Sequence, residues 1–250
     1  MCKPKKWRNS SNRVPRCIAD FEIAGQSTAL VVIDMQNYIA NPASCRWLST
    51  YYPEAAEYYF RRLAELVIPN TKRLLTFFRD NQLRVAFVTS GAELPDGRDG
   101  HPLRRSSDSC RSPILPMSSC YEVGSNELNI IGELAPRREE LVVRKVTSSA
   151  FNSTGIDRRL RNIGISTLLM TGVVSNGCVE ATLRDAVDLG YQCAMVEDAV
   201  ASFSLEMDEA CFRVIDRLYG YVLTAGELIT RLATEITSSE GDEAGGGTED

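Results

Sequence analysis

Three polar residues with complementary chemistry each follow a short apolar segment that is typical of a buried strand. They are Asp34 after residues 29–33, Lys145 after residues 141–144, and Cys178 shortly after residues 167–171. A carboxylate can accept the proton of a thiol and later return it to a leaving group, and an ammonium group beside a thiol favours its ionisation. Together, these three groups could attack a carbonyl carbon and form a covalent intermediate.

Cys178 stands where a helix is expected to begin. Apolar residues recur at helical spacing over residues 179–189, and Ser175 or Asn176 is available as the N-cap. The positive end of a helix dipole favours thiolate over thiol, so we expect a lowered pKa for Cys178. A free cysteine is more commonly a small buried hydrophobic residue, and we prefer that interpretation for the other seven cysteines.

Strand and helix alternate along most of the chain. Expected strands cover residues 29–34, 84–89, 141–144, 167–171, 192–196 and 221–223, and expected helices cover 53–80 with a bend near Pro69, 126–134, 154–162, 178–189, 207–219 and 225–237. Such alternation specifies a parallel sheet covered by helices on both faces. We therefore predict an α/β fold with three layers, α/β/α, and a six-stranded, mostly parallel, Rossmann-like sheet. The carboxyl ends of its strands would bring the three polar residues to one edge.

The chain divides into one large domain with two extensions. We predict an N-terminal extension over residues 1–26, the folded domain over 27–237 and a disordered acidic tail over 238–250. Residues 90–125 are rich in Gly, Pro, Ser and Arg and are too long for an ordinary connection. We interpret this segment as a lid or active-site loop, although it could be an insertion without a role.

Composition excludes several classes of protein. The 250 residues are 44% hydrophobic and 24% charged, as in an ordinary globular protein, and the net charge of -5 argues against a nucleic-acid surface. The apolar runs are too short to span a membrane, so we expect no membrane association. The eight cysteines form no C-x-x-C pair, and the basic start has no secretory apolar region. Reduced thiols and a cytoplasmic location are expected.

Three separated motifs together resemble one known family. They are VIDMQN at residues 32–37, KVTSSAF at 145–151 and TGVVSNGCV at 171–179. In this order and spacing they resemble the isochorismatase-like cysteine hydrolases, whose members include nicotinamidase, N-carbamoylsarcosine amidohydrolase, biuret hydrolase and ureidoacrylate amidohydrolase. The resemblance extends over roughly residues 27–236.

The resemblance implies a role for each matching residue. Cys178 would attack an amide carbonyl, Asp34 would act as general acid and base, and Lys145 would orient both. A non-proline cis peptide bond between Val173 and Val174 would turn the backbone N–H groups of Val174 and Cys178 into an oxyanion hole, which stabilises the developing negative charge. The reaction would pass through a thioester and release ammonia or an amine.

The chain also departs from the pattern of the nicotinamidases in this family. Those enzymes carry an Asp-x-His element and a further histidine for a metal, whereas the single histidine here is His101, in a loop. We therefore expect neither a metal nor another cofactor, and nicotinamide is disfavoured as substrate. Isochorismatase itself cleaves a vinyl ether without a nucleophilic cysteine, so the presence of Cys178 favours amide cleavage.

The expected substrate is a small linear carbamoyl or ureido amide of the biuret or N-carbamoyl type. We assign Gln36, Tyr38, Phe151 and Asn176 to substrate binding, and Arg46, Arg98, Arg104, Arg105 and Arg111 offer cations for a carboxylate or a ureido oxygen. The alternatives are a maleamate-like or nicotinamide-like substrate, a non-catalytic binding protein and a redox-sensing thiol protein. A nucleotide-binding protein is disfavoured because no G-x-G-x-x-G follows the first strand. By resemblance, we expect a homodimer or homotetramer.

Overall fold

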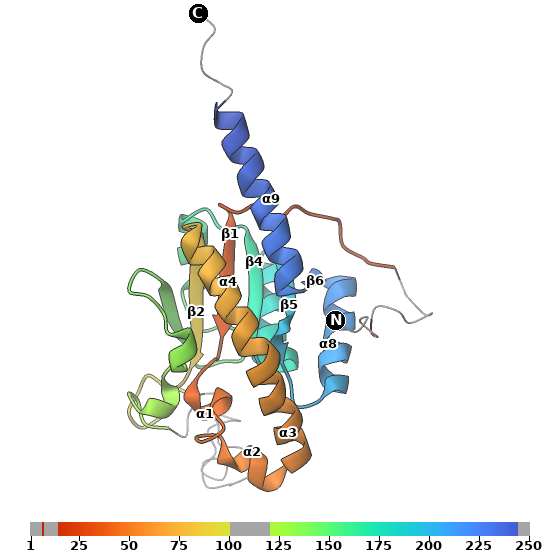
Figure 1. Ribbon diagram of the computed structural model, residues 1–250. Helices are drawn as coiled ribbons and strands as arrows, with labels where there is room; N and C mark the ends of the chain where they lie inside the picture. Colours follow the sequence, from red (N-terminus) through yellow and green to blue (C-terminus); the bar gives the residue numbers. More distant parts are fainter. Residues whose placement is uncertain (1–6, 8–14, 101–120, 245–250) are drawn as a thin grey trace, which may run out of the picture.

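The core of the molecule is a six-stranded sheet in which every neighbouring pair of strands is parallel (Figure 1). The computed structural model describes residue 7 and residues 15–100 and 121–244. The strands are β1 (Thr28–Ile33), β2 (Arg84–Ser90), β3 (Leu141–Lys145), β4 (Thr167–Val173), β5 (Gln192–Ala201) and β6 (Tyr221–Leu223), in the order β3-β2-β1-β4-β5-β6. The predicted α/β class and Rossmann-like sheet are confirmed.

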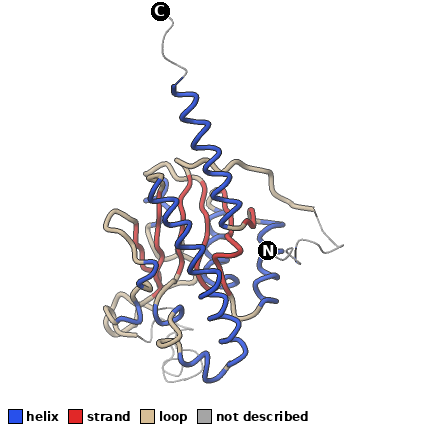
Figure 2. The backbone as a smooth tube through the Cα atoms, viewed as in Figure 1, coloured by secondary structure: helices blue, strands red, loops and turns tan. Residues whose placement is uncertain are grey.

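Helices cover both faces of this sheet (Figure 1, Figure 2). One face carries α3 (Pro53–Arg62), α4 (Ile68–Asp80) and α9 (Ala225–Ala244), and the other carries α6 (Ile156–Asn162), α7 (Glu180–Asp188) and α8 (Leu205–Leu218). The short helices α1 (Asn37–Ala40) and α2 (Arg46–Tyr51) lie beyond the carboxyl end of β1. The result is the predicted three-layer arrangement.

Alternating side chains of the central strand supply both hydrophobic cores. In β1, Leu30 and Val32 pack into the core under α3, α4 and α9, whereas Val31 and Ile33 pack into the core under α6, α7 and α8. All four side chains are almost completely buried. A strand covered on both faces must be apolar along its whole length, which is why β1 is recognisable in the sequence.

The helical stretch over residues 53–80 is continuous but changes its geometry before Pro69. The π-helical turn η2 (Leu63–Val67) joins α3 to α4, and Pro69 lies in the first turn of α4. Proline has no backbone N–H to donate to the preceding turn, and a widened turn accommodates this loss. The π-helical turn therefore lies where the sequence predicts a bend in the helix near Pro69.

Two predictions of secondary structure are wrong. The single helix expected over residues 126–134 is two 3-10 turns, η4 (Asn126–Leu128) and η5 (Gly132–Leu134). The chain between them pairs with the segment after β1, because Ile130 forms a bridge with Gln36 and the Ile131 N–H donates to the Met35 carbonyl. The tail predicted to be disordered from residue 238 is helical as far as Ala244, where α9 ends.

Other predictions concern segments that the structure covers only in part. Half of the N-terminal extension, residues 1–6 and 8–14, and residues 101–120 of the predicted lid lie outside the described residues. Within the extension, the Arg16 side chain donates to the carbonyls of Asp216 and Gly220, and its guanidinium stacks on the ring of Tyr221. In the part of the chain that is described, no helix has the length and apolar character needed to cross a bilayer.

Candidate active site

The three predicted catalytic side chains meet at the carboxyl edge of the sheet. Lys145 Nζ lies 2.8 Å from Asp34 Oδ2 and 3.2 Å from Cys178 Sγ, and it donates to both. Asp34 follows β1, Lys145 ends β3, and Cys178 follows β4. Strands β1 and β4 are neighbours at the point where the strand order reverses, which is where open α/β sheets bind ligands.

The close approach of β1 and β4 brings Asp34 near the turn that follows β4 and carries Cys178. Ile33 pairs with Gly172, whose φ is +105°. A Cβ atom at Gly172 would lie 2.0 Å from the Ile33 carbonyl oxygen, so no larger residue fits here without movement of the backbone. Glycine at this position lets the two strands come together immediately before their functional residues.

The backbone of Asp34 adopts a left-handed conformation with φ of 52°. This region is uncommon for residues other than glycine, and such local strain is typical of functional sites. Its N–H donates to the Val88 carbonyl over 2.8 Å, and its carbonyl accepts from the Gln36 N–H over 2.7 Å. These bonds hold the turn that directs the carboxylate toward Lys145.

Gln36 fixes the surrounding loops, and its assignment to substrate binding is not supported. Its Nε2 donates to the carbonyls of Ser90 and Leu128 over 3.0 and 2.7 Å, and its Oε1 accepts from the Ser90 N–H over 2.7 Å. The side chain is completely buried. Because both ends of the amide already bind the backbone, Gln36 joins the end of β2 to the η4 turn.

The turn that carries Cys178 is an irregular helical turn, η6 (Ser175–Val179). Asn176 and Gly177 depart from helical backbone angles, and the peptide bond between Val173 and Val174 is cis. The N-cap position is Val174, with no side-chain cap, so the prediction of Ser175 or Asn176 as the N-cap is wrong. The regular helix α7 begins only at Glu180, and Cys178 is partly exposed.

Asp34 and Lys145 form a buried ion pair. Their residues are 2% and 0% exposed, and burial by itself lowers the pKa of Lys145, but the neighbouring Asp34 carboxylate and Cys178 raise that pKa above its ordinary value. Lys145 is therefore a permanent cation. Asp34 Oδ1 is buried and has no hydrogen-bond partner among the described residues, so it can accept a proton or a substrate N–H.

The electrostatics of the cysteine contradict the sequence-based expectation. Burial and the negative charge of the Asp34 carboxylate raise the pKa of the Cys178 thiol to about 11, and Lys145 offsets these effects only in part. Cys178 therefore holds its proton at neutral pH, and the predicted low pKa is wrong. A protonated nucleophile needs a base at the moment of attack, and the adjacent carboxylate can serve as that base.

Alkylation of Cys178 by iodoacetamide is expected to be slow at pH 7 and to accelerate with pH. Because the thiolate is the reactive form, the rate should rise about tenfold per pH unit until it levels off near the thiol pKa of about 11. The exposed Cys17 serves as the internal reference in the same peptide map. A Cys178 rate that levels off below pH 8 would contradict the raised pKa.

Lys145→Met is expected to destabilise the fold strongly because it leaves the buried Asp34 carboxylate without its cation. We expect a loss of about 3–5 kcal/mol in the free energy of unfolding, measured by urea denaturation. The double variant Asp34→Asn/Lys145→Met removes both charges and should regain most of this loss. Equal stabilities of the single and double variants would show that the charge pair has no such role.

The other predicted substrate-binding residues have separate locations. The pKa of Tyr38 is raised, chiefly by burial and also by the negative charge of Asp34, so its hydroxyl lies within electrostatic range of that carboxylate. Asn176 is exposed at the rim, where its Oδ1 accepts from Ser202 over 2.7 Å. The ring of Phe151 instead packs on Tyr191, 5.7 Å away between centroids, just before β5 begins.

The predicted cationic residues and the histidine are not gathered at this site. The Arg46 side chain donates to the Ala43 carbonyl, and the exposed Arg98 forms an ion pair with Asp96. His101 and the three remaining arginines of the loop lie outside the described residues. Within the described ranges, no three His, Cys, Asp or Glu side chains are grouped as metal ligands.

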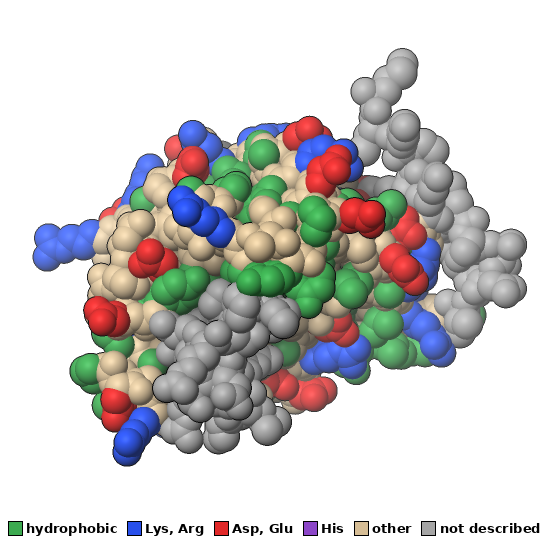
Figure 3. Space-filling model, turned by 90° about the horizontal axis from the view of Figure 1, so that it is seen from below, with side chains coloured by type: hydrophobic (Ala, Val, Ile, Leu, Met, Phe, Trp, Pro, Cys, Tyr) green, Lys and Arg blue, Asp and Glu red, His purple; other side chains and the backbone are tan. Residues whose placement is uncertain are grey.

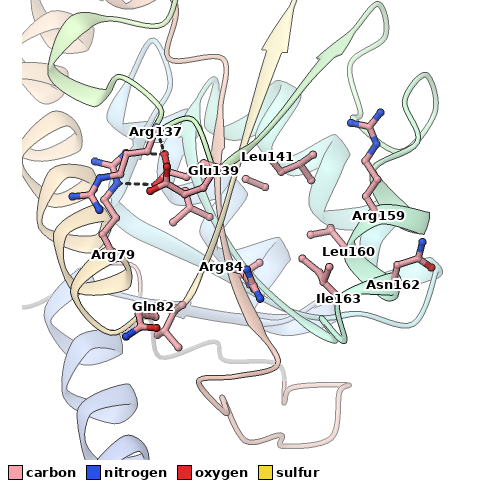
Figure 4. Close-up of a pocket in the computed structure, with 15 residues that line it drawn as sticks. Arg79, Gln82, Arg84, Arg137, Glu139, Leu141, Arg159, Leu160, Asn162 and Ile163 are labelled. Atoms are coloured by element: carbon pink, nitrogen blue, oxygen red, sulfur yellow. Dashed lines mark hydrogen bonds and ion pairs between the residues drawn. The ribbon is translucent and has the colours of Figure 1, made fainter.

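A large open groove lies at the opposite edge of the sheet (Figure 4). None of the three side chains is among the residues that line it. Its volume is about 780 Å³, and its lining includes Arg84 at the start of β2 and Leu141 at the start of β3. Arg79 binds Glu140 through two hydrogen bonds of 2.7 and 2.9 Å at its border. The groove therefore lies at the amino edge of the sheet, whereas the three side chains lie at the carboxyl edge.

The face with the carboxyl ends of the strands carries charges of both signs (Figure 3). Acidic, basic and hydrophobic side chains are interspersed around its visible border. The visible part of this face therefore has no patch of one charge that would select ligands by charge alone.

Comparisons with known proteins agree with this architecture. A model of the isochorismatase domain matches residues 28–227. Ureidoacrylate amidohydrolase RutB from Serratia proteamaculans (strain 568) is 29% identical over 233 residues, which cover 90% of this chain and 89% of that protein.

Two solved structures share the fold. A cysteine hydrolase from Pseudomonas syringae pv. phaseolicola 1448A superposes with a TM-score of 0.70 at 23% identity, covering 90% of this chain and all of the other. N-carbamoylsarcosine amidase from Thermoplasma acidophilum superposes with a TM-score of 0.57 at 24% identity, covering 80% of this chain and 96% of the other. At these identities the likeness concerns the fold alone.

Proposed function

The chain belongs to the isochorismatase family and is an amidohydrolase, and we propose that it cleaves a small linear ureido or carbamoyl compound through a thioester on Cys178. The observation that carries the proposal is the pair of hydrogen bonds from Lys145 Nζ to Asp34 Oδ2 and Cys178 Sγ, at 2.8 and 3.2 Å. One cation thus holds a base and a nucleophile side by side. This arrangement suits covalent catalysis at a carbonyl carbon.

In the first half of the reaction, Asp34 removes the thiol proton as Cys178 Sγ attacks the substrate carbonyl carbon. The raised pKa of the thiol makes this transfer necessary, and the positive charge of Lys145 stabilises the thiolate as it forms. The tetrahedral oxyanion would accept hydrogen bonds from the backbone N–H groups of Val174 and Cys178. When the C–N bond breaks, Asp34 returns the proton to the leaving nitrogen, and the thioester remains on Cys178.

In the second half, water hydrolyses the thioester. Asp34, again a carboxylate, takes a proton from the water as its oxygen attacks the thioester carbonyl. The C–S bond breaks, the proton passes to Cys178, and the acid product leaves. The net reaction converts an amide and water into a carboxylic or carbamic acid and ammonia or an amine, and the enzyme returns to its starting state.

Two observations support a ureido or carbamoyl substrate. Asp34 Oδ1 is a buried acceptor with no partner among the described residues, and it can receive an N–H of such a group. The relative from Serratia proteamaculans carries the name ureidoacrylate amidohydrolase. A ureido group places N–H donors on both sides of its carbonyl, so one N–H can bind Asp34 while the carbonyl carbon faces Sγ.

A redox-sensing role fits the site less well than hydrolysis. Oxidation of cysteine follows its thiolate character, and burial and the Asp34 charge raise the pKa of Cys178 to about 11. The resting thiol is therefore a poor target for mild oxidants. Hydrolysis has no such difficulty because Asp34 supplies the base within the catalytic step.

The proposal is tested by ammonia release over a panel of biuret, N-carbamoyl amino acids, ureidoacrylate, maleamate and nicotinamide. For any compound that turns over, rapid acid quenching followed by peptide mass spectrometry should reveal an acyl group on the Cys178 peptide. The exposed Cys17 is the internal control and should remain unmodified. Turnover of only maleamate or nicotinamide would overturn the substrate class. If samples quenched during turnover at saturating substrate contain only unmodified Cys178 peptide, the thioester intermediate would be contradicted.

A further inference from the structure

A second buried carboxylate, Asp208 of α8, lies against the turn that carries the nucleophile. Asp208 is 0% exposed, and its Oδ1 accepts a hydrogen bond of 2.6 Å from the Ser175 hydroxyl. Its Oδ2 accepts a hydrogen bond of 2.7 Å from the Tyr58 hydroxyl and lies 3.2 Å from Arg62 Nε. Both carboxylate oxygens are therefore occupied, one by the turn and one by α3.

Arg62 joins this carboxylate to the sheet. Its Nε also donates to the Val200 carbonyl over 2.9 Å, and its terminal nitrogen donates to the Glu197 carbonyl. The pKa of Asp208 is raised, because burial outweighs the opposing effects of the Arg62 charge, the Ser175 and Tyr58 hydroxyls and a backbone hydrogen bond from Ser202. A buried charge is stable only with such partners. The cluster therefore ties α3, α8 and the end of β5 to a single point beneath the turn.

The η6 turn that carries Cys178 lacks the regular helical backbone and the side-chain cap that usually stabilise the start of a helix. Asn176 and Gly177 do not follow helical angles, and no side chain caps the start of η6. Ser175 is held from both sides, because its hydroxyl donates to Asp208 and its carbonyl accepts from Cys211 Sγ over 3.4 Å. Both partners belong to α8, so contacts from a neighbouring helix supply what the local backbone lacks.

We propose that Asp208 is a positioning residue, which holds the Cys178 turn in place through Ser175. The inference rests on the proposed function, since it concerns the placement of the nucleophile in that reaction. Ser175 begins η6 and lies three residues before Cys178, so movement of its backbone moves Sγ relative to Lys145 and Asp34. A misplacement of about 1 Å at a reacting atom can cost on the order of a hundredfold in rate.

Two matched variants isolate this role, because each removes one hydroxyl that donates to Asp208. Ser175→Ala breaks the link to the turn, and Tyr58→Phe breaks a link to α3 only. We expect Ser175→Ala to lower kcat by about tenfold to a hundredfold with KM within about twofold, and Tyr58→Phe to lower kcat by less than about threefold. Equal kcat losses in the two variants, or a loss confined to KM, would overturn the proposal.

A second readout does not depend on turnover. Hydrogen exchange followed by mass spectrometry should show faster exchange of the backbone amides in the peptide containing Cys178 for Ser175→Ala, and wild-type exchange there for Tyr58→Phe. Unchanged exchange in Ser175→Ala would overturn the positioning role even if both variants unfold at lower temperature. A wild-type protein that releases no ammonia from any compound would refute the proposed function, and the exchange result would still decide whether Asp208 holds the turn.

Discussion

Cys178→Ala is expected to reduce kcat/KM for the preferred amide by at least about 10⁴-fold. Loss of a covalent nucleophile leaves only substrate binding and electrostatic stabilisation, and water would have to attack an amide without the two easier steps of the thioester route. The side chain is partly exposed, so its truncation should change the free energy of unfolding by no more than about 1 kcal/mol. The measurement is ammonia release at low substrate concentration.

The matched control for this prediction is Cys17→Ala, which removes an exposed thiol whose backbone N–H donates to the Arg217 carbonyl of α8. It should retain wild-type kcat/KM. If Cys178→Ala kept more than about a tenth of the wild-type rate, the nucleophile would have to be another group, and the function of Lys145 as a partner of the thiol would lose its basis.

Asp34→Asn is expected to change turnover and thiol reactivity in opposite directions. Without its general base and acid the enzyme should lose about 10³- to 10⁴-fold in kcat. The same substitution removes the negative charge that raises the pKa of Cys178, while Lys145 remains to lower it. Iodoacetamide should therefore alkylate Cys178 faster at pH 8 in Asp34→Asn than in the wild-type protein.

These opposite effects separate a chemical role of Asp34 from damage to the fold. General damage to the fold would not by itself couple a loss of kcat to a lower pKa of the Cys178 thiol. The control Asp188→Asn makes the same change of net charge at the exposed end of α7. Asp188→Asn should leave both measurements unchanged. Slower alkylation of Cys178 in Asp34→Asn would show that Asp34 does not raise the pKa of the thiol.

Much of the scaffold could be predicted from the sequence because its strands are buried on both faces. The apolar run of β1 predicts both its own position and the placement of Asp34 at its end. Parallel strands present their carboxyl ends at one edge of the sheet, which predicts that Lys145 and Cys178 lie at the same edge as Asp34. The distances among the Asp34, Lys145 and Cys178 side chains depend on how the strands pair, and no local sequence pattern predicts them.

The electrostatics and the supporting contacts depend on tertiary structure. The pKa of Cys178 is determined by how deeply the thiol is buried and how close the Asp34 charge lies, and a helix start in the sequence indicates neither. Gln36 lies two residues after Asp34 in the sequence, but its side-chain amide forms hydrogen bonds with the backbone of β2 and η4. Such contacts join residues far apart in the chain.

The sequence pattern of α8 does mark Asp208, which contacts the turn that carries Cys178, as an unusual residue. The buried positions of α8 are Asp208, Cys211, Phe212 and Ile215, which have the i, i+3, i+4, i+7 spacing of an apolar helix face. A carboxylate on the buried face of an amphipathic helix requires a partner. A charged residue at an apolar position of a helix pattern therefore marks a candidate for a structural or functional role.

The order of the strands has a consequence for how the protein acquires activity. Asp34 and Lys145 are separated by 111 positions in the chain, and β2 must already lie between their strands before the two can meet. Cys178 joins them only when β4 has paired with the other side of β1. Contacts of such long sequence separation slow folding, because loop-closure entropy opposes their formation. A nascent chain that ends before β4 contains Asp34 and Lys145 but lacks Cys178. Recovery of activity during refolding therefore reports the completed topology of the sheet.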